Sequence, residues 1–188
     1  MKSGITVLWD RETPFKQYLT ERGFDCEVVT PKLVAAPFFS WRACRLALVP
    51  AGFGNPFFSG VLDDLRANSM IITDFVKAGG TLLVSGAHSH SNAYNWLPRS
   101  LTYVRAEHTA KLKRVQENKA AEIVETDECM CDGYFDEVDE GWDVVLAMEK
   151  DDEEKAILVV LKCGAGEIIA TTIHEYPSDR FFEYCVRR

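Results

Sequence analysis

A histidine beside a carboxylate is the residue combination in this sequence best suited to acid-base chemistry. His174 is followed directly by Glu175 near the end of the chain. The side-chain pKa of histidine is ordinarily close to neutrality, so an imidazole can donate a proton, accept one or orient a ligand. We therefore interpret His174 and Glu175 as the candidate catalytic pair, with Asp10 as an alternative acidic partner.

His88 and His90 form a second group of imidazoles, separated by one residue. Together with His174 they could bind Zn²⁺ or a similar metal, completed by Asp10 or Glu175. The spacing is compatible with a metal site but is not specific for one. Loop histidines that hydrogen-bond locally and cap a following helix explain the same pattern. We therefore expect no metal and no cofactor.

Cys129 and Cys131 are followed by Asp132 and Gly133, a combination that also suggests metal binding. Only one such cysteine pair is present, and the usual two-residue spacing between the cysteines is absent. Because Asp-Gly is a common turn dipeptide, we interpret 129–133 as a turn that carries two thiols. The six cysteines of the chain are irregularly spaced, which favours reduced thiols over a disulfide framework.

The composition is that of a globular protein of 188 residues, with 47% hydrophobic and 27% charged residues. This length predicts a single domain over 1–188. A formal net charge of −8 argues against nucleic-acid binding. No apolar run approaches the roughly 18 to 20 residues of a membrane span, and the first run is too short for a signal peptide. We expect a cytoplasmic protein that binds neither nucleic acid nor membrane.

Short apolar runs alternate with helical patterns in the first half of the chain. Thr13-Pro14 is a typical helix start, and Gly79-Gly80 is a typical helix stop. Such alternation predicts right-handed crossovers and a parallel sheet with helices on both faces. The expected strands lie within 5–9, 26–30, 45–56 and 81–86, and the expected helices within 13–23 and 61–78.

After about residue 100, β-like segments are separated by acidic turns. The clearest hairpin signal is 156–173, where a glycine-containing connection joins two β-rich runs. A last helix is expected to begin at Ser178 or Asp179. We predict an α/β, flavodoxin-like, three-layer doubly wound fold with a mostly parallel sheet and added antiparallel strands in the C-terminal half. The other β-like segments are 102–105, 121–125 and 142–149.

Open parallel sheets bind their ligands outside the carboxyl ends of the strands. If the strands end as expected, the residues that follow them should converge in one crevice. In particular, we predict that His174 lies within roughly 12 to 15 Å of Gly86, which is a few strand spacings. The predicted binding residues are Asp10, Phe53, Gly54, Asn55, Ser85, Gly86, His88 and His90.

Aromatic residues are concentrated between positions 38 and 58. They could line an apolar pocket, form the face of a homodimer, or pack as core beneath a long loop. Only an exposed patch would favour an interface. The cluster consists of Phe38, Phe39, Trp41, Phe53, Phe57 and Phe58.

Three segments together resemble the class I glutamine amidotransferase superfamily. Segment 46–54 resembles the strand and Pro-Gly-Gly turn of that family, and segment 74–89 resembles the helix, double glycine and strand before its nucleophile. Segment 164–177 resembles the late hairpin that carries the family's histidine, here His174. The resemblance covers most of the chain and implies the fold of that superfamily.

The catalytic residues of that family are incomplete in this sequence. Active members have Gly-x-Cys-x-Gly at a tight strand-to-helix turn, and Gly86 stands in the place of the cysteine. Ser85 could be considered as a substitute, but neighbouring residues of a strand point to opposite faces. Tyr176 occupies the position expected for the family's acid. The pattern is similar to non-amidotransferase branches, including trehalose-utilisation-type domains and the amidotransferase-like domain of some β-galactosidases.

The resemblance and these departures lead to one main functional hypothesis and two alternatives. We expect a catalytically dead amidotransferase-like domain, without glutaminase activity, that binds a small molecule or a partner protein. The first alternative is a hydrolase or lyase that acts on a carbohydrate-like molecule with His174 as its acid or base. The second alternative is a purely structural interaction domain. An open, polar crevice would favour binding or catalysis over a structural role.

Overall fold

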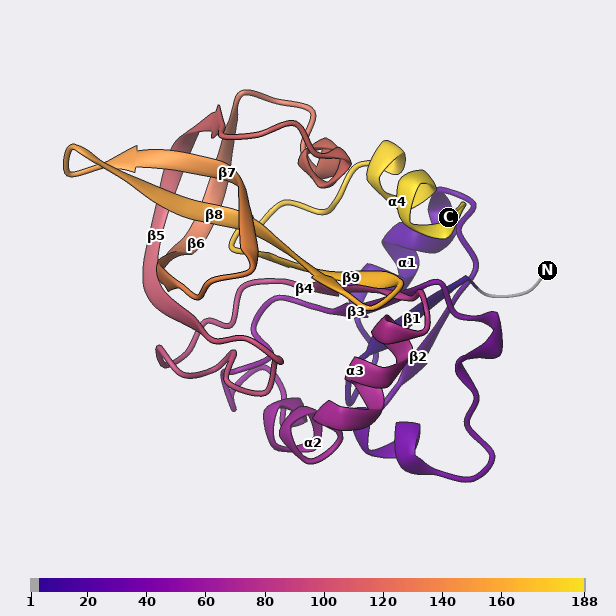
Figure 1. The fold of residues 1–188 in the computed structure, drawn as a ribbon. Helices are drawn as coiled ribbons and strands as arrows, with labels where there is room; N and C mark the ends of the chain where they lie inside the picture. The colour runs from indigo at the N-terminus through magenta and orange to yellow at the C-terminus, as the bar shows by residue number, and fades with distance from the viewer. Residues whose placement is uncertain (1–3, 188) are drawn as a thin grey trace.

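The computed structural model describes residues 4–187, and five of the strands in this range, four from the first half of the chain and the last one, form a parallel sheet (Figure 1). These strands are β1 (Ile5–Leu8), β2 (Cys26–Val29), β3 (Leu46–Val49), β4 (Thr81–Val84) and β9 (Gly166–Thr171). Their order is β2-β1-β3-β4-β9, and every neighbouring pair is parallel. All residues of β1, β3, β4 and β9 are buried, because their apolar runs are covered on both faces of the sheet.

The α-helices of the described chain are α1 (Pro14–Glu21), α2 (Val61–Ala67), α3 (Ser69–Lys77) and α4 (Asp179–Val186). The side chains of Thr13 and Ser178 cap α1 and α4 by accepting hydrogen bonds from N–H groups in the first turn, as the sequence predicts. The single helix expected over 61–78 is divided at Asn68 into α2 and α3. No helix within residues 4–187 is long and apolar enough to cross a membrane.

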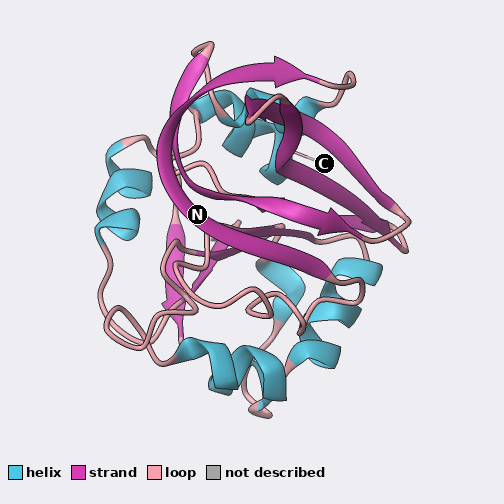
Figure 2. Cartoon of the chain, turned by 90° about the vertical axis from the view of Figure 1, so that its left-hand side faces the viewer, coloured by secondary structure: helices cyan, strands magenta, loops and turns pink. Residues whose placement is uncertain are grey.

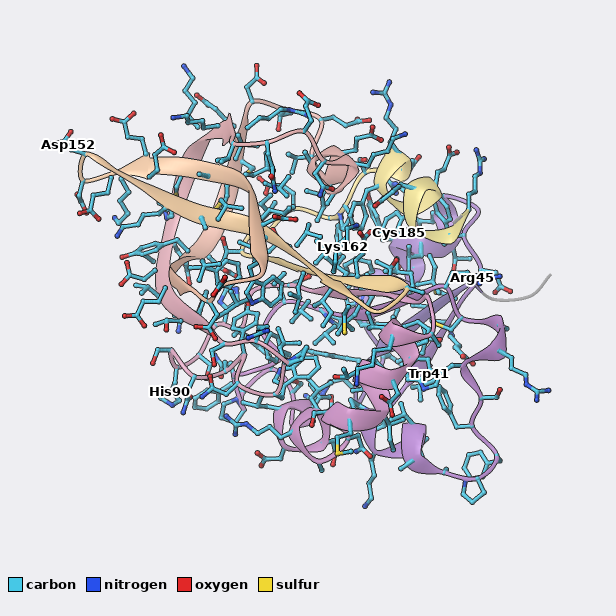
Figure 3. All side chains as sticks on the ribbon, in the orientation of Figure 1. Trp41, Arg45, His90, Asp152, Lys162 and Cys185 are labelled. Carbon is cyan, nitrogen blue, oxygen red and sulfur yellow. The ribbon has the colours of Figure 1, made fainter. Side chains whose placement is uncertain are left out.

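The remaining strands are long and antiparallel: β5 (Leu101–Arg114), β6 (Glu128–Val138), β7 (Trp142–Lys150) and β8 (Glu153–Cys163). Strand β5 pairs with both β6 and β7, and β8 also pairs with both of them. The four strands therefore close into a small barrel, whose strong curvature is visible in Figure 2. The hairpin between β7 and β8, with Asp152 at its tip, projects from this barrel (Figure 3).

The predicted flavodoxin-like α/β fold with a mostly parallel sheet is wrong. The antiparallel strands are longer than the parallel ones, and they form a barrel rather than an addition to the sheet edge. The physical reason lies in the turns. Asp151, Asp152 and Gly164 have positive φ and reverse the chain within a few residues, so β8 pairs with its sequence neighbours β7 and β9. A parallel pairing would need a crossover of a dozen or more residues.

Segment 129–133 was predicted as a turn, and this prediction is wrong. The segment lies inside β6 and pairs with β5. Gly133 is required by the close approach of the two strands, because a Cβ atom there would lie 2.2 Å from the carbonyl oxygen of Val104. The Asp-Gly dipeptide therefore marks a tight strand contact with a bulge nearby, not a chain reversal.

Segment 121–125 was predicted as β-like, but most of it lies in the 3₁₀ helix η3 (Lys119–Ile123). The side chain of Asn118 accepts a hydrogen bond from the N–H of Ala120 and so starts this helix. The buried side chains of η3 pack towards α4 at the C-terminal end of the chain. Two further 3₁₀ helices are η1 (Pro31–Ala35) and η2 (Trp41–Ala43).

The aromatic residues between positions 38 and 58 do not form one surface patch. Phe53 is fully buried, with its ring 5.3 Å from that of Tyr94. Trp41 stacks on Phe75 of α3 at 4.4 Å. A homodimer face stays a prediction that the fold does not test. The exposed members of the cluster are Phe38, Phe57 and Phe58.

Strand β9 joins the sheet to the barrel and thereby positions the candidate site. It runs parallel to β4 on one side and antiparallel to β8 on the other. An isolated bridge between Cys131 of β6 and Ile173, just after β9, ties the barrel to the same edge. The carboxyl ends of β4 and β9 therefore meet β6 at one place in the fold.

Candidate functional site

The loop after β4 is held by hydrogen bonds to the loop after β3. The N–H of Gly52 donates to the carbonyl oxygen of Gly86 at 2.7 Å, and the N–H of Gly54 donates to that of Ala87 at 3.0 Å. The hydroxyl of the buried Tyr94 donates to the carbonyl oxygen of Ser85 at 2.8 Å. These bonds fix the backbone of the loop that carries Gly86.

The space beside Gly86 is filled by the carboxylate of Asp132. A Cβ atom built on Gly86 would lie 1.6 Å from Oδ2 of Asp132, far inside any van der Waals contact. Asp132 lies on β6, and its N–H donates to the carbonyl oxygen of Thr172 at 2.9 Å. The barrel therefore inserts a carboxylate into the space beside Gly86.

Asp132 is only 1% exposed and is surrounded by polar partners on one side. The hydroxyl of Tyr103 lies 3.0 Å from its carbonyl oxygen and 3.3 Å from Oδ1. Burial, and then the negative charge of Asp132, raise the pKa of Tyr103, so the phenol stays protonated and can donate. Within residues 4–187, Oδ2 is a buried oxygen that receives no well-aligned hydrogen bond.

His88 lies beside this oxygen. Its Nε2 atom lies 2.9 Å from Oδ2 of Asp132, which is an ion-pair distance although the alignment is poor for a hydrogen bond. His88 has a φ of 50°, a left-handed conformation that is uncommon for a residue with a Cβ atom. The ring of His88 lies 5.8 Å from that of His174 and 5.9 Å from that of Phe58. The strained backbone of His88 thus directs its imidazole towards the buried carboxylate of Asp132.

His174 completes the group from the loop after β9. Its side chain is exposed, and its N–H donates to the carbonyl oxygen of Met130 at 2.8 Å. One ligand atom each from His88, Asp132 and His174 lie within 4.8 Å of one another. Two imidazoles and a carboxylate at this separation can exchange protons or hold a cation.

A cavity of about 790 Å³ opens beside this group, and His174 is part of its wall. Its wall combines aromatic rings with polar and charged side chains, among them Arg11, Glu12 and Glu175. Phe57, at the rim, is 92% exposed. The lining residues include Trp9, Arg11, Phe15, Phe58, Ser85 and His174. A concave site that combines aromatic surface with groups able to hydrogen-bond can accept a small molecule.

The structure brings together several of the residues predicted from the sequence. Gly86, His88 and His174 meet at Asp132, and Ser85 lines the cavity beside them. Glu175 also lines the cavity, but its Oε1 atom accepts a hydrogen bond from the N–H of Met130 at 2.5 Å. That carboxylate is therefore held against β6.

Other predicted residues have local structural partners instead. Asp10 accepts a hydrogen bond from the N–H of Gly60 at 2.8 Å and pairs with Arg11. Asn55 accepts one from the N–H of Phe57 and so closes its own turn. These two polar side chains stabilise the loops around the cavity rather than the group at Asp132.

The remaining predicted binding residues are Phe53, Gly54 and His90, and they lie outside the group at Asp132. Phe53 is buried beneath the loop. Gly54 leaves room for Ser89, because a Cβ atom on Gly54 would lie 2.7 Å from Cβ of Ser89. His90 is exposed at the surface (Figure 3) and is not part of the group of ligand atoms.

Sequence reasoning missed Asp132 and Tyr103, which come from β6 and β5. The available signal was a single acidic residue within the otherwise β-like run 129–135, which was assigned to a turn. Cys129 and Cys131 precede it in the strand, and both are buried, with sulfur atoms 3.7 Å apart. Buried and exposed positions alternate from 128 to 131, and continued alternation would leave Asp132 exposed. Its burial depends on the pairing of β6 with β5 and on its approach to Gly86, which no local pattern in the sequence indicates.

Comparison with known proteins gives matches only to solved structures, since no family model and no curated protein sequence matches the chain. A β-galactosidase from Bacillus circulans sp. alkalophilus has a TM-score of 0.61 and 12% identity, over 97% of this chain and 30% of its own. A protein from Salmonella typhimurium LT2, described as cytoplasmic, has a TM-score of 0.59 and 14% identity, over 96% of this chain and 92% of its own.

A ThuA-like protein from Bacteroides uniformis ATCC 8492 has a TM-score of 0.55 and 8% identity, over 96% of this chain and 84% of its own. At such identities the similarity shows a common fold and no more. The chain spans 30% of the length of the β-galactosidase that it matches. The resemblance to the non-amidotransferase branches is therefore confirmed for the fold: this chain folds like a ThuA-like protein and like part of a β-galactosidase.

Proposed function

We propose that this chain is a catalytically inactive amidotransferase-like domain that binds a small molecule in the cavity beside His174. The observation that carries the proposal is the position of Asp132, whose Oδ2 atom lies 1.6 Å from the place of a Cβ atom on Gly86. A cysteine nucleophile has no room at this position. A thioester step of the amidotransferase kind is therefore not available to the chain.

The residues that line the cavity suit a polar small molecule that also has apolar faces. Trp9 and Phe58 offer flat aromatic surfaces, and His174 offers a nitrogen that can donate or accept a hydrogen bond. Structures with the same fold include parts of enzymes named β-galactosidase and exo-β-1,4-mannosidase. We therefore choose carbohydrate-like molecules as the first class to test. Two Salmonella proteins of this fold are described as cytoplasmic, which supports a cytoplasmic location.

Ligand-observed saturation-transfer NMR tests the proposal. Sets of monosaccharides, disaccharides and amino acids are mixed with the wild-type protein, and saturation transfer is recorded for each compound. We expect saturation transfer to at least one sugar. His174→Ala should weaken the affinity for that sugar about tenfold or more, since a hydrogen bond and part of the cavity wall are lost. His90→Ala is the matched control, because His90 is an exposed histidine outside the cavity. Binding that is equal in both variants, or absent for every compound, contradicts the proposal.

A second candidate function is hydrolysis or elimination on a carbohydrate-like substrate with His174 as the acid or base. It is favoured by the exposed imidazole in the cavity wall, 5.8 Å from the ring of His88. Aryl glycosides that release a coloured phenol provide the assay. This candidate requires turnover that is lost in His174→Ala and kept in His90→Ala. Binding without turnover favours the inactive domain.

A further inference from the structure

The geometry points to a divalent transition-metal site formed by His88, Asp132 and His174. These residues come from the loop after β4, from β6 and from the loop after β9. One ligand atom of each lies within 4.8 Å of the other two. The proposal goes beyond the proposed function and does not depend on it, because a metal could bind whether or not the cavity accepts an organic molecule.

The separations are close to those of a metal centre. Two zinc ligands at 2.0–2.1 Å and a tetrahedral angle lie about 3.3 Å apart. Nε2 of His88 and Oδ2 of Asp132 are 2.9 Å apart, so they need only a small outward movement to accept the ion between them. His174 has an exposed side chain and can supply the remaining adjustment.

The environment of the Asp132 side chain independently indicates a cation site. Its side chain is 1% exposed, and Oδ2, which faces His88, receives no well-aligned hydrogen bond within residues 4–187. A buried carboxylate oxygen without a donor is costly, and coordination of a cation satisfies both its charge and its lone pair. A histidine at a φ of 50° beside it adds to the cost of the arrangement without a ligand.

The ligand set also indicates which metal would bind. Two imidazole nitrogens and one carboxylate oxygen suit Zn²⁺, Co²⁺, Ni²⁺ or Fe²⁺, whereas Ca²⁺ and Mg²⁺ prefer oxygen ligands alone. With three protein ligands, a fourth position is open to water or a ligand oxygen. His174 is shared between the metal ligands and the cavity wall, so the proposed metal site adjoins the cavity.

Glu107 provides an outer partner for His88. Its Oε1 atom lies 3.9 Å from Nδ1 of His88. A carboxylate near the distal nitrogen favours the tautomer in which Nε2 is free to bind metal, as in many histidine metal sites.

Titration of the metal-free, tag-free protein with Co²⁺ tests the site directly. Co²⁺ bound by nitrogen and oxygen ligands gives visible absorption bands, and competition by Zn²⁺ at the same protein then gives the zinc affinity. We expect one equivalent of Co²⁺ to saturate the bands. His174→Ala and Asp132→Asn should each weaken binding about 100-fold or more, since each removes a direct ligand.

His90→Ala is the matched control and should change affinity less than about twofold, a shift within ordinary scatter for a surface residue. Because Asp132→Asn alters a buried group and can impair folding, His174→Ala is the deciding variant, and circular dichroism confirms that each protein is folded. The site is refuted if folded wild-type protein shows no saturable 1:1 binding, or if His174→Ala binds as tightly as His90→Ala. Neither result affects the saturation-transfer test of sugar binding, which is performed without metal.

Discussion

Replacement of Gly86 by alanine is the most informative single change, because the backbone at this position does not itself require glycine. Gly86 does not have a positive φ, so alanine can adopt the same backbone conformation. What is missing is space: the new Cβ atom would lie 1.6 Å from Oδ2 and 2.2 Å from Cγ of Asp132. The carboxylate must therefore withdraw by about 1.8 Å to reach an ordinary contact of 3.4 Å.

This withdrawal disturbs the partners of a buried charge. Oδ1 would leave Tyr103, now 3.3 Å away, and Oδ2 would leave His88, now 2.9 Å away. Overpacking of a tight interior costs about 1–3 kcal/mol, and loss of hydrogen bonds to a buried charged group costs a similar amount. We expect Gly86→Ala to lower the free energy of unfolding by about 2–5 kcal/mol.

Urea denaturation followed by circular dichroism measures this loss, with Gly4→Ala as the control. A Cβ atom on Gly4 would meet only Val186, at 3.7 Å, so that variant should change stability by less than about 0.5 kcal/mol. In an Asp132→Ala background the clash is removed, and Gly86→Ala should then cost less than about 1 kcal/mol. The reasoning is refuted if Gly86→Ala is as mild as the control, or if its cost is the same with and without Asp132.

Two further predictions concern buried groups around the same core. Tyr94→Phe leaves the carbonyl oxygen of Ser85 without its 2.8 Å donor, so unfolding in urea should require about 1–3 kcal/mol less; unchanged stability would contradict a role in holding this loop. Burial raises the pKa of Cys44 from 9.0 to about 11. The unfolded thiol therefore ionises first, and the stability from this group, present below pH 9, is lost as pH rises towards 11. The stability difference between wild type and Cys44→Ala should shrink by roughly 2 kcal/mol between pH 8.5 and 11, and a constant difference would rule out this assignment.

The parts of the fold that were predictable are those fixed by neighbouring residues. Thr13 and Ser178 start helices because a hydroxyl next to a helix start can accept the free N–H groups, whatever the rest of the fold. The apolar runs of β1, β3 and β4 indicate strands buried on both faces. The hairpin of β8 and β9 follows from its glycine-containing turn.

The barrel was not predictable in this way, because its closure depends on a pairing between strands that are distant in sequence. Nothing local in Leu112 or Met148 shows that they face each other across β5 and β7. Strand β6 was missed because Asp132-Gly133 resembles a turn, whereas the glycine there serves a close contact with Val104. The overall sheet was therefore predicted as mostly parallel.

Only part of the candidate site could be predicted, because one of its residues comes from the barrel. The rule that ligands bind at the carboxyl ends of parallel strands brings Gly86, His88 and His174 to one edge, and the structure places them there. Asp132 approaches that edge from the barrel, so its place in the site depends on the pairing that the sequence did not reveal.

Ammonia release from glutamine tests the central claim most directly, with the wild-type protein and Gly86→Cys assayed with and without ammonia-accepting partners. We predict no release above background from either protein, because the carboxylate of Asp132 occupies the space beside residue 86 even when a cysteine is introduced there. Turnover by the wild type that is lost when any one of the six cysteines is changed would contradict the account. So would glutaminase activity in Gly86→Cys while Asp132 is still present.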